Sequence, residues 1–330
     1  MKLMKAGLAA ALLVAAASAA LAQQPAGPQP SASLAVPADA PPPRPTPPGP
    51  HKVVIEADPG LMSHTVYRPQ DLSGFSGETR LPIIAWGNGA CSNAGLLFAT
   101  FLSQVASHGY LVIASGPKDA VLPAFASQRT GQAAQSAGTV PAGRTEDEDL
   151  IKAIDWAIAE NGRPGSPYFG KLDPTKVAVM GQSCGGLQAT AVAADPRIKT
   201  VVIWNSGVFN NPTRPSPDGQ PARSLSGATK DSLKAFHAPV AYFLGGPADV
   251  AYANGKDDFE QVSVPAFFGS INAGHGGTFN HPGAGWFGEV GVKWLDWRLK
   301  GDAAAGRWFV GEDCVLCRDP AWEVRRKNLG

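Results

Sequence analysis

The sequence has 330 residues, with 28 lysines and arginines against 27 aspartates and glutamates, so its formal net charge is only +1. The basic residues are scattered evenly and form no cluster, so we expect no nucleic-acid partner. The chain contains four cysteines, enough for two disulfides if the protein is exported.

The first 22 residues have the features of a secretory signal peptide. Lys2 and Lys5 give a positive start, a run of alanine and leucine follows, and Ala20-Leu21-Ala22 fits a small-x-small cleavage site. A membrane anchor is disfavoured because the apolar run is short and a proline-rich segment comes next. No cysteine follows the cleavage site, which argues against a lipoprotein. We expect an exported protein, periplasmic or extracellular, with no membrane span after cleavage.

Residues 23–50 are mostly proline, alanine, serine and glutamine. Such a segment cannot form an apolar face, so we expect an extended, disordered linker, with a ligand for a proline-binding module as the less favoured reading. The remaining residues, 51–330, are enough for one large α/β domain.

Along that domain, short apolar runs alternate with helical patterns, which predicts a mostly parallel twisted sheet of about eight strands with helices on both faces. Residues 116–144 show no periodicity and are predicted to be a long loop, which is disordered or functional; whether it acts as a lid is open. The predicted strands are 52–57, 63–69, 81–86, 110–115, 176–180, 201–204, 240–244 and 265–270, the first two as an antiparallel pair. The predicted helices are 96–109, one launched by a capping box at Thr145 and Glu148, 187–194, and a last one that carries Trp294, Leu295 and Leu299.

The stretch at 181–186 reads GQSCGG and follows a predicted strand directly. The pattern G-x-S-x-G is weak by itself, but a strand before it and a helix after it are the context of a nucleophile elbow. Glycines are needed there because the turn brings helix and strand backbones together. The turn would hold the Ser183 hydroxyl above the sheet, and the N–H of Cys184 would lie at a helix N-terminus, aimed at a developing oxyanion.

A nucleophilic serine needs a histidine base, and that histidine needs a carboxylate to orient it. Asp249 follows the 240–244 strand and His275 follows the 265–270 strand, in the expected order and at the edge where catalytic groups gather. The rival base is His281. The rival acids Asp257, Asp258 and Glu260 fall further along, on the next helix. The sequence therefore predicts Ser183, His275 and Asp249 as a catalytic triad.

The second oxyanion donor should come from the loop after the 81–86 strand. The backbone N–H of Asn88 is the preferred candidate, with Gly89 and Ala90 as alternatives. This chemistry requires no metal and no organic cofactor.

The sequence resembles the α/β-hydrolases, and within them the branch of the dienelactone hydrolases and cutinase-like polyester hydrolases. The resemblance covers nearly all of 51–330 and is carried by 105–115, 177–186, 248–252 and 271–277, together with the 291–302 helix and the late cysteines. It implies an α/β-hydrolase fold and ester hydrolysis. The polyester hydrolases of this branch usually have methionine after the nucleophile and an aromatic residue in the oxyanion loop. Here Cys184 and Asn88 stand at those positions, so activity on polymers does not follow.

The cysteines also lie close to the predicted site. Cys184 is adjacent to the nucleophile and Cys91 lies in the oxyanion loop, so we expect a Cys91–Cys184 disulfide and a local Cys314–Cys317 pair. The alternative for Cys184 is a free, buried small side chain. A zinc half-site or a thioredoxin-type motif at 314–317 is disfavoured because no second ligand pair accompanies it.

Two tryptophans are candidate substrate contacts. Trp204 ends a strand at the active edge and Trp286 follows His275, so either could form an aromatic wall or simply belong to the core. No cluster of lysine or arginine accompanies the motifs, so we expect a neutral ester, small or polymeric, as substrate. The sequence thus predicts a secreted serine esterase. The alternatives are a serine peptidase or acyltransferase on the same fold, or a non-catalytic binding protein. The oligomeric state is open.

Overall fold

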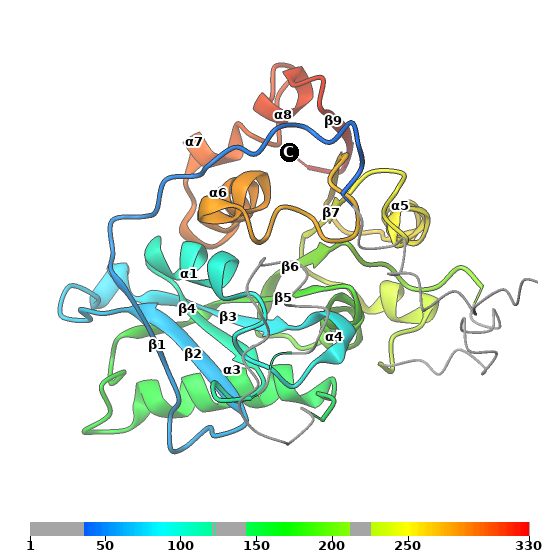
Figure 1. Cartoon of the computed structure of the whole chain (residues 1–330). Coiled ribbons are helices and arrows are strands. Elements are labelled where there is room, and N and C mark those ends of the chain that lie inside the picture. Colours follow the sequence, from blue (N-terminus) through cyan, green and yellow to red (C-terminus); the bar gives the residue numbers. More distant parts are fainter. Residues whose placement is uncertain (1–35, 121, 123–142, 212–225, 330) are drawn as a thin grey trace, which may run out of the picture. The chain divides into compact units, whose positions relative to one another are not determined.

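A nine-stranded sheet runs through the described part of the chain, in the order β1-β2-β4-β3-β5-β6-β7-β8-β9 (Figure 1). The computed structural model describes residues 36–120, 122, 143–211 and 226–329. The strands are β1 Val53–Glu56, β2 His64–Pro69, β3 Leu81–Gly87, β4 Leu111–Ser115, β5 Leu172–Gln182, β6 Ile198–Trp204, β7 Val240–Leu244, β8 Ala266–Ile271 and β9 Trp322–Lys327.

The six central strands, from β4 to β8 in the sheet order, are mutually parallel, and the three outer strands are antiparallel to their neighbours. The mostly parallel sheet is as predicted. The ninth strand, β9, was not predicted, because four of the six residues in its sequence WEVRRK are charged. Charged side chains of this kind are typical of an edge strand, which they protect against pairing with another chain.

Helices cover both faces of the sheet, as predicted. In Figure 1, α1 and α6 lie on one side of the sheet and α3 on the other. The helices are α1 Ala99–Ser107, α3 Glu148–Gly162, α4 Cys184–Val192, α5 Tyr252–Gln261, α6 Gly285–Lys300, α7 Ala303–Gly306 and α8 Val315–Arg318.

Strand β7 shows why buried parallel strands are continuously apolar. Val240, Tyr242 and Leu244 belong to the core cluster that also contains residues of α3, α4 and α5, whereas Ala241 and Phe243 belong to the cluster that contains residues of α1 and α6. Both sides of each central strand therefore face an apolar core, and only their ends are free to carry polar side chains.

The capping box predicted at Thr145 and Glu148 is wrong. Helix α3 begins where expected, but its N-cap residue is Asp147 and no side chain caps it. The Thr145 hydroxyl instead donates to the carbonyl of Cys91, and its backbone N–H donates to the same oxygen. The contact of Thr145 with the distant Cys91 has therefore replaced the expected local cap of α3.

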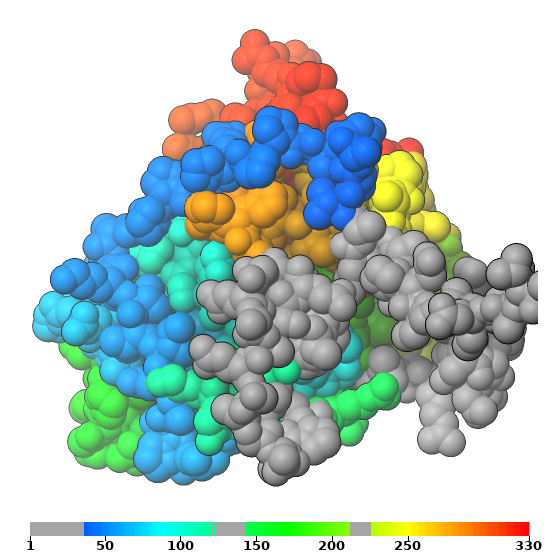
Figure 2. Space-filling view, viewed as in Figure 1, coloured from blue at the N-terminus to red at the C-terminus, as the bar shows by residue number. Residues whose placement is uncertain are grey.

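The predicted disordered linker also needs correction, since residues 36–50 pack against the domain. Arg44 stacks over the Trp286 ring at 4.4 Å, Thr46 donates to the carbonyl of Gly285, and the N–H of Gly49 donates to Ser107. Figure 2 shows this segment, in blue, lying across α6, in orange. The folded domain therefore begins before residue 51.

The predicted signal peptide at 1–22, the rest of the linker, and residues 121 and 123–142 of the predicted loop lie outside the described residues. Among the helices that are described, none combines the length and the apolar character needed to cross a membrane.

Candidate active site

Ser183 lies at a sharp turn between β5 and α4. Its backbone has φ 54° and ψ −118°, a conformation that non-glycine residues rarely adopt and that persists only where the surroundings enforce it. Two hydrogen bonds do so: the N–H of Ser183 donates to the carbonyl of Trp204 at 2.9 Å, and the Ser206 hydroxyl donates to the carbonyl of Ser183 at 2.6 Å. The turn is thus tied to the end of β6.

The glycines around this turn are required by close backbone contacts. A Cβ atom at Gly181 would lie 2.1 Å from the carbonyl oxygen of Gly185. One at Gly185 would lie 2.0 Å from the carbonyl oxygen of Gly87 and 2.7 Å from the backbone nitrogen of Asn88. Both distances to oxygen are too short for any side chain, so the pattern G-x-S-x-G is explained by packing.

The three predicted triad residues are brought together. The Nε2 atom of His275 lies 3.0 Å from the Ser183 hydroxyl oxygen, and its Nδ1 atom lies 2.6 Å from the Oδ1 atom of Asp249. With Asp249 ionised, Nδ1 carries the proton and donates it, which leaves Nε2 to accept from the Ser183 hydroxyl. Among the described residues, the rival base His281 makes no contact of this kind, and its Nδ1 atom is buried without a hydrogen-bond partner.

Asp249 is buried and held by four donors. Its Oδ1 atom accepts from His275 and from the N–H of Ala251, and its Oδ2 atom accepts from the Asn205 amide and the N–H of Gly245. Burial alone would raise the pKa of this carboxyl. The hydrogen bond and charge of His275, with the two backbone donors, outweigh burial and hold the pKa below its ordinary value. The carboxylate is therefore both ionised and fixed in direction.

Asn205 is a site residue that sequence reasoning missed. Its amide nitrogen donates to Asp249 at 2.8 Å and to the carbonyl of Gly274 at 3.0 Å, so one side chain joins the acid to the histidine loop. Its backbone lies in the left-handed region, with φ 42°. The available signal was its position directly after β6, the same placement that identified Asp249 and His275.

The rival acids lie on α5, as predicted. Asp258 is fully buried and accepts from the N–H of Val208 at 2.7 Å and from Lys230 at 2.6 Å. Burial raises its pKa to about 6, against the opposing effect of Lys230. It holds the loop after β6 rather than His275.

The predicted oxyanion loop lies directly against the elbow. Buried Asn88 organises this loop through its side chain: Oδ1 accepts from the Trp86 indole, and Nδ2 donates to the carbonyls of Ser92, Ala94 and Ser115. Its backbone nitrogen faces Gly185 in the first turn of α4, and Cys184 is the first residue of that helix. The two predicted donors therefore belong to adjoining segments.

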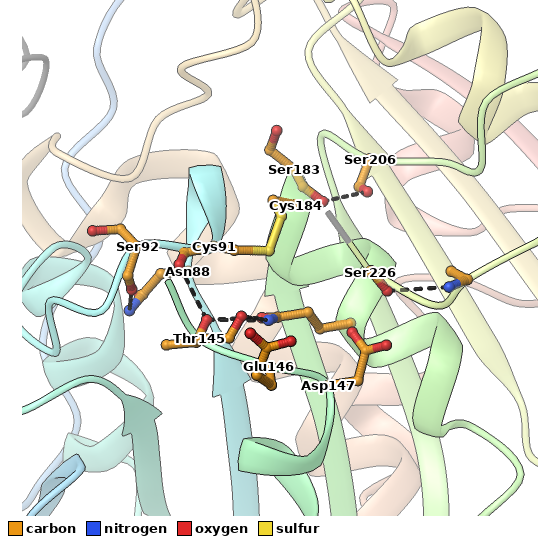
Figure 3. Close-up of a disulfide and its surroundings, with 12 residues drawn as sticks. Asn88, Cys91, Ser92, Thr145, Glu146, Asp147, Ser183, Cys184, Ser206 and Ser226 are labelled. Atoms are coloured by element: carbon orange, nitrogen blue, oxygen red, sulfur yellow. Dashed lines mark hydrogen bonds between the residues drawn. A yellow bond between two sulfur atoms is a disulfide. The ribbon is translucent and has the colours of Figure 1, made fainter. Parts of the chain in front are cut away.

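Both expected disulfides are present. Cys91 bonds to Cys184 with a Cα–Cα distance of 5.1 Å, and Cys314 bonds to Cys317. Figure 3 shows the first bond bridging the oxyanion loop to the start of α4, directly beside Ser183.

The aromatic wall predicted at Trp204 is not found. Trp204 is fully buried, stacks on Phe243 at 4.7 Å and packs against Phe101, so it belongs to the core and presents no surface to a substrate. Trp286 is partly buried and contacts Trp322 and Arg44. Among the described residues, no hydrogen bond or ring contact joins either indole to the side chain of Ser183, His275 or Asp249.

No protein-family profile matches this chain, and a search of the curated proteins found no match. A hydroxyl, an imidazole and a buried carboxylate in a hydrogen-bonded line can remove the hydroxyl proton and store it during attack on a carbonyl.

Proposed function

We propose that this protein is an exported serine esterase of the α/β-hydrolase type, which cleaves neutral carboxylic esters through an acyl-enzyme. The observation that supports the proposal most is the unbroken line from the Ser183 hydroxyl through His275 to buried Asp249. The chain order serine, acid, histidine and the strained turn after a parallel strand are the further features of such hydrolases.

In this mechanism the Ser183 oxygen attacks the ester carbonyl while Nε2 of His275 takes the hydroxyl proton. The C–O bond to the alcohol then breaks, and His275 returns the proton to the leaving alkoxide. Water repeats the sequence on the acyl-enzyme, with His275 as base, and releases the acid. Asp249 stays ionised throughout, orients the imidazole and stabilises its charged form.

The negative charge on the carbonyl oxygen requires nearby N–H donors. The proposal assigns these to the backbone of Cys184 and of the loop that starts at Asn88. Cys184 supports this role because the first N–H groups of a helix are oriented toward an anion at its N-terminus.

Hydrolysis of p-nitrophenyl esters, from acetate to palmitate, tests the proposal. The protein should span residues 23–330, so that the packed segment 36–50 is kept. Ser183→Ala should lower kcat by about 10⁵-fold or more, because no other group can take over the attack. A fluorophosphonate probe should label the native protein and not the variant.

The outcomes separate the rival functions. Folded native protein that is inert toward every ester and is not labelled would overturn the proposal in favour of a binding role. Labelling at Ser183 with cleavage of amides, or with acyl transfer to an alcohol in preference to water, would replace the esterase with a peptidase or an acyltransferase.

A further inference from the structure

The backbone of the oxyanion loop is unusual at two successive residues. Ala90 has φ 57° and Cys91 has φ 48°, so both are left-handed although neither is glycine. Only about a few per cent of non-glycine residues adopt this region, and asparagine, aspartate and histidine are over-represented among them. A loop built this way needs contacts from outside itself to keep its shape.

Those contacts converge on Cys91. Its carbonyl accepts from the N–H of Thr145 at 2.9 Å and from the Thr145 hydroxyl at 3.3 Å. The Thr145 hydroxyl and carbonyl in turn accept from the side chain of Gln188 in α4. Figure 3 shows Thr145 below the disulfide. These hydrogen bonds hold the loop through the carbonyl of Cys91 and reach α4 at Gln188, one turn beyond Cys184.

The Cys91–Cys184 disulfide is the one covalent tie between the loop and α4 among the described residues. Both cysteines are buried, with exposed fractions of 0% and 4%. The bond joins a left-handed residue of the loop to the residue directly after Ser183. It therefore links the two segments whose N–H groups must converge on a single oxygen.

We propose that Cys91 and Cys184 are positioning residues, whose disulfide holds the Asn88–Cys91 loop against α4 so that the oxyanion donors converge. This inference rests on the proposed function. Without the bond, Ala90 and Cys91 return to negative φ. The loop N–H then moves away from the carbonyl oxygen of the substrate, while the triad stays intact. Catalysis then depends on oxidation: two thiols give two electrons and two protons to a disulfide oxidant such as oxidised glutathione, which becomes two glutathione thiols.

The test compares Cys91→Ala/Cys184→Ala with the matched control Cys314→Ala/Cys317→Ala, which removes the other disulfide. Each is assayed on an ester and on the corresponding thionoester, which has sulfur in place of the carbonyl oxygen. Sulfur is a weak acceptor on a longer bond, so it gains little from N–H groups set for oxygen. The ratio of the two kcat/KM values therefore reports the oxyanion site and not overall folding.

We expect the first variant to lose about 10–100-fold in kcat on the ester, with a much smaller loss on the thionoester. The control variant should keep the ratio of the native protein. A ratio that is unchanged in the first variant, or lowered equally in the control, would overturn the inference. Native protein that neither hydrolyses esters nor reacts at Ser183 would instead overturn the proposed function.

Two further measurements apply even if the first variant folds poorly. The control variant, which keeps only the Cys91–Cys184 pair, can be purified reduced and then treated with oxidised glutathione. Its ratio of kcat/KM on the ester to that on the thionoester should rise as mass spectrometry shows the loss of two thiols. No rise on complete oxidation would contradict the inference.

The second measurement adds Ala90→Gly to Cys91→Ala/Cys184→Ala. This change should recover kcat severalfold, because glycine accepts positive φ freely; no recovery would also contradict the inference.

Discussion

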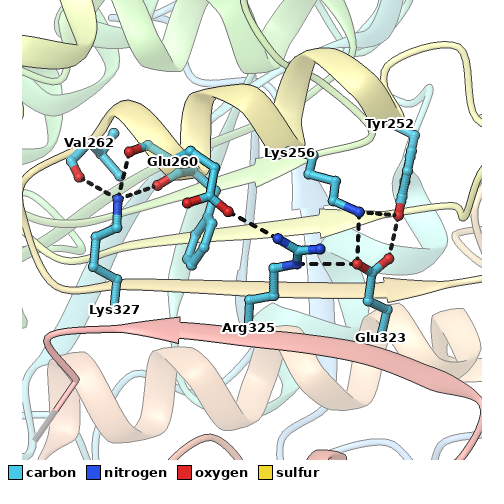
Figure 4. Close-up of polar contacts among 8 residues, drawn as sticks. Tyr252, Lys256, Glu260, Val262, Glu323, Arg325 and Lys327 are labelled. Carbon is cyan, nitrogen blue, oxygen red and sulfur yellow. Dashed lines mark hydrogen bonds and ion pairs between the residues drawn. The ribbon is translucent and has the colours of Figure 1, made fainter.

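Asp249, in the loop before helix α5, and Glu323, which contacts that helix from β9, are two carboxylates that each accept several hydrogen bonds. Asp249 precedes the helix, is 3% exposed and takes two of its four bonds from backbone N–H groups. Glu323 lies in β9, has a side chain that is 35% exposed, and takes its bonds from Tyr252, Lys256 and Arg325, all of them side chains (Figure 4).

The difference in donors separates a carboxylate that can orient a catalyst from one that can only join two elements. Backbone donors and burial leave Asp249 a single direction, which fixes the imidazole of His275. Long side chains around Glu323 can rearrange with water, so its three hydrogen bonds attach two elements without fixing a precise direction. Residue type alone does not distinguish the two.

The largest effect in this comparison is expected for Asp249→Asn. The amide keeps the size of the side chain but removes the charge and stabilises the wrong tautomer of His275. We expect kcat for ester hydrolysis to fall by about 10³–10⁴-fold. The measurement is steady-state hydrolysis of p-nitrophenyl esters near pH 7, with circular dichroism as the folding control. Retention of more than a tenth of the activity would mean that Asp249 does not orient the base.

A third carboxylate, Asp258, lies on the buried side of α5 and is paired with a lysine. The variant Lys230→Met tests this pair, and we expect an effect between those of Asp249 and Glu323. Burial raises the pKa of Asp258 to about 6, above the unfolded value, so the folded state binds this proton more tightly and loses stability as pH rises from about 4 to 6. Above that range the carboxylate needs Lys230. We expect the variant to lose about 3 kcal/mol of unfolding free energy at pH 8, and much less at pH 5.

Urea denaturation at the two pH values measures this difference. Asp257→Asn is the control, because Asp257 also bonds to Lys230 but its side chain is 41% exposed, and its loss should be about 0–1 kcal/mol. Equal losses for Lys230→Met at pH 5 and pH 8 would show that the charge of Asp258 is not what Lys230 compensates.

Most of the sheet and the triad positions could be predicted from the sequence, for one physical reason. Central parallel strands are buried on both faces, so they read as continuous apolar runs, and a reactive residue directly after such a run must lie at the edge of the sheet. Ser183, Asp249 and His275 all have this signature. The catalytic activity itself stays a prediction.

What could not be predicted depends on tertiary contacts. Thr145 has the local pattern of a helix cap, but its hydroxyl donates to the carbonyl of Cys91 instead. Trp204 follows the alternation of β6 into the core, and its place at the strand end was a misleading signal. Asn205 has no motif, and residues 36–50 have the composition of a linker although Arg44 and Thr46 bind them to the domain.

The smallest effect is expected for Glu323→Gln, at the exposed end of the comparison. The change removes one charge from the contacts with Lys256 and Arg325, and we expect a loss of about 0.5–1 kcal/mol in unfolding free energy, reduced by added salt. Burial alone would raise the pKa of Glu323, but hydrogen bonds from the three side chains outweigh it and lower the pKa. The contribution of Glu323 to the free energy of unfolding is therefore present above the unfolded pKa and is lost as pH falls below it.

The same variant tests whether β9 influences catalysis. Tyr252, which bonds to Glu323, also donates its N–H to the carbonyl of Asp249, so β9 is linked through Tyr252 to the loop that carries the acid. If Glu323 only attaches the edge strand, kcat in the variant should equal that of the native protein. A fall in kcat comparable to that of Asp249→Asn would instead mean that α5 helps to orient His275. Glu323 could then no longer be described as a carboxylate that only joins two elements.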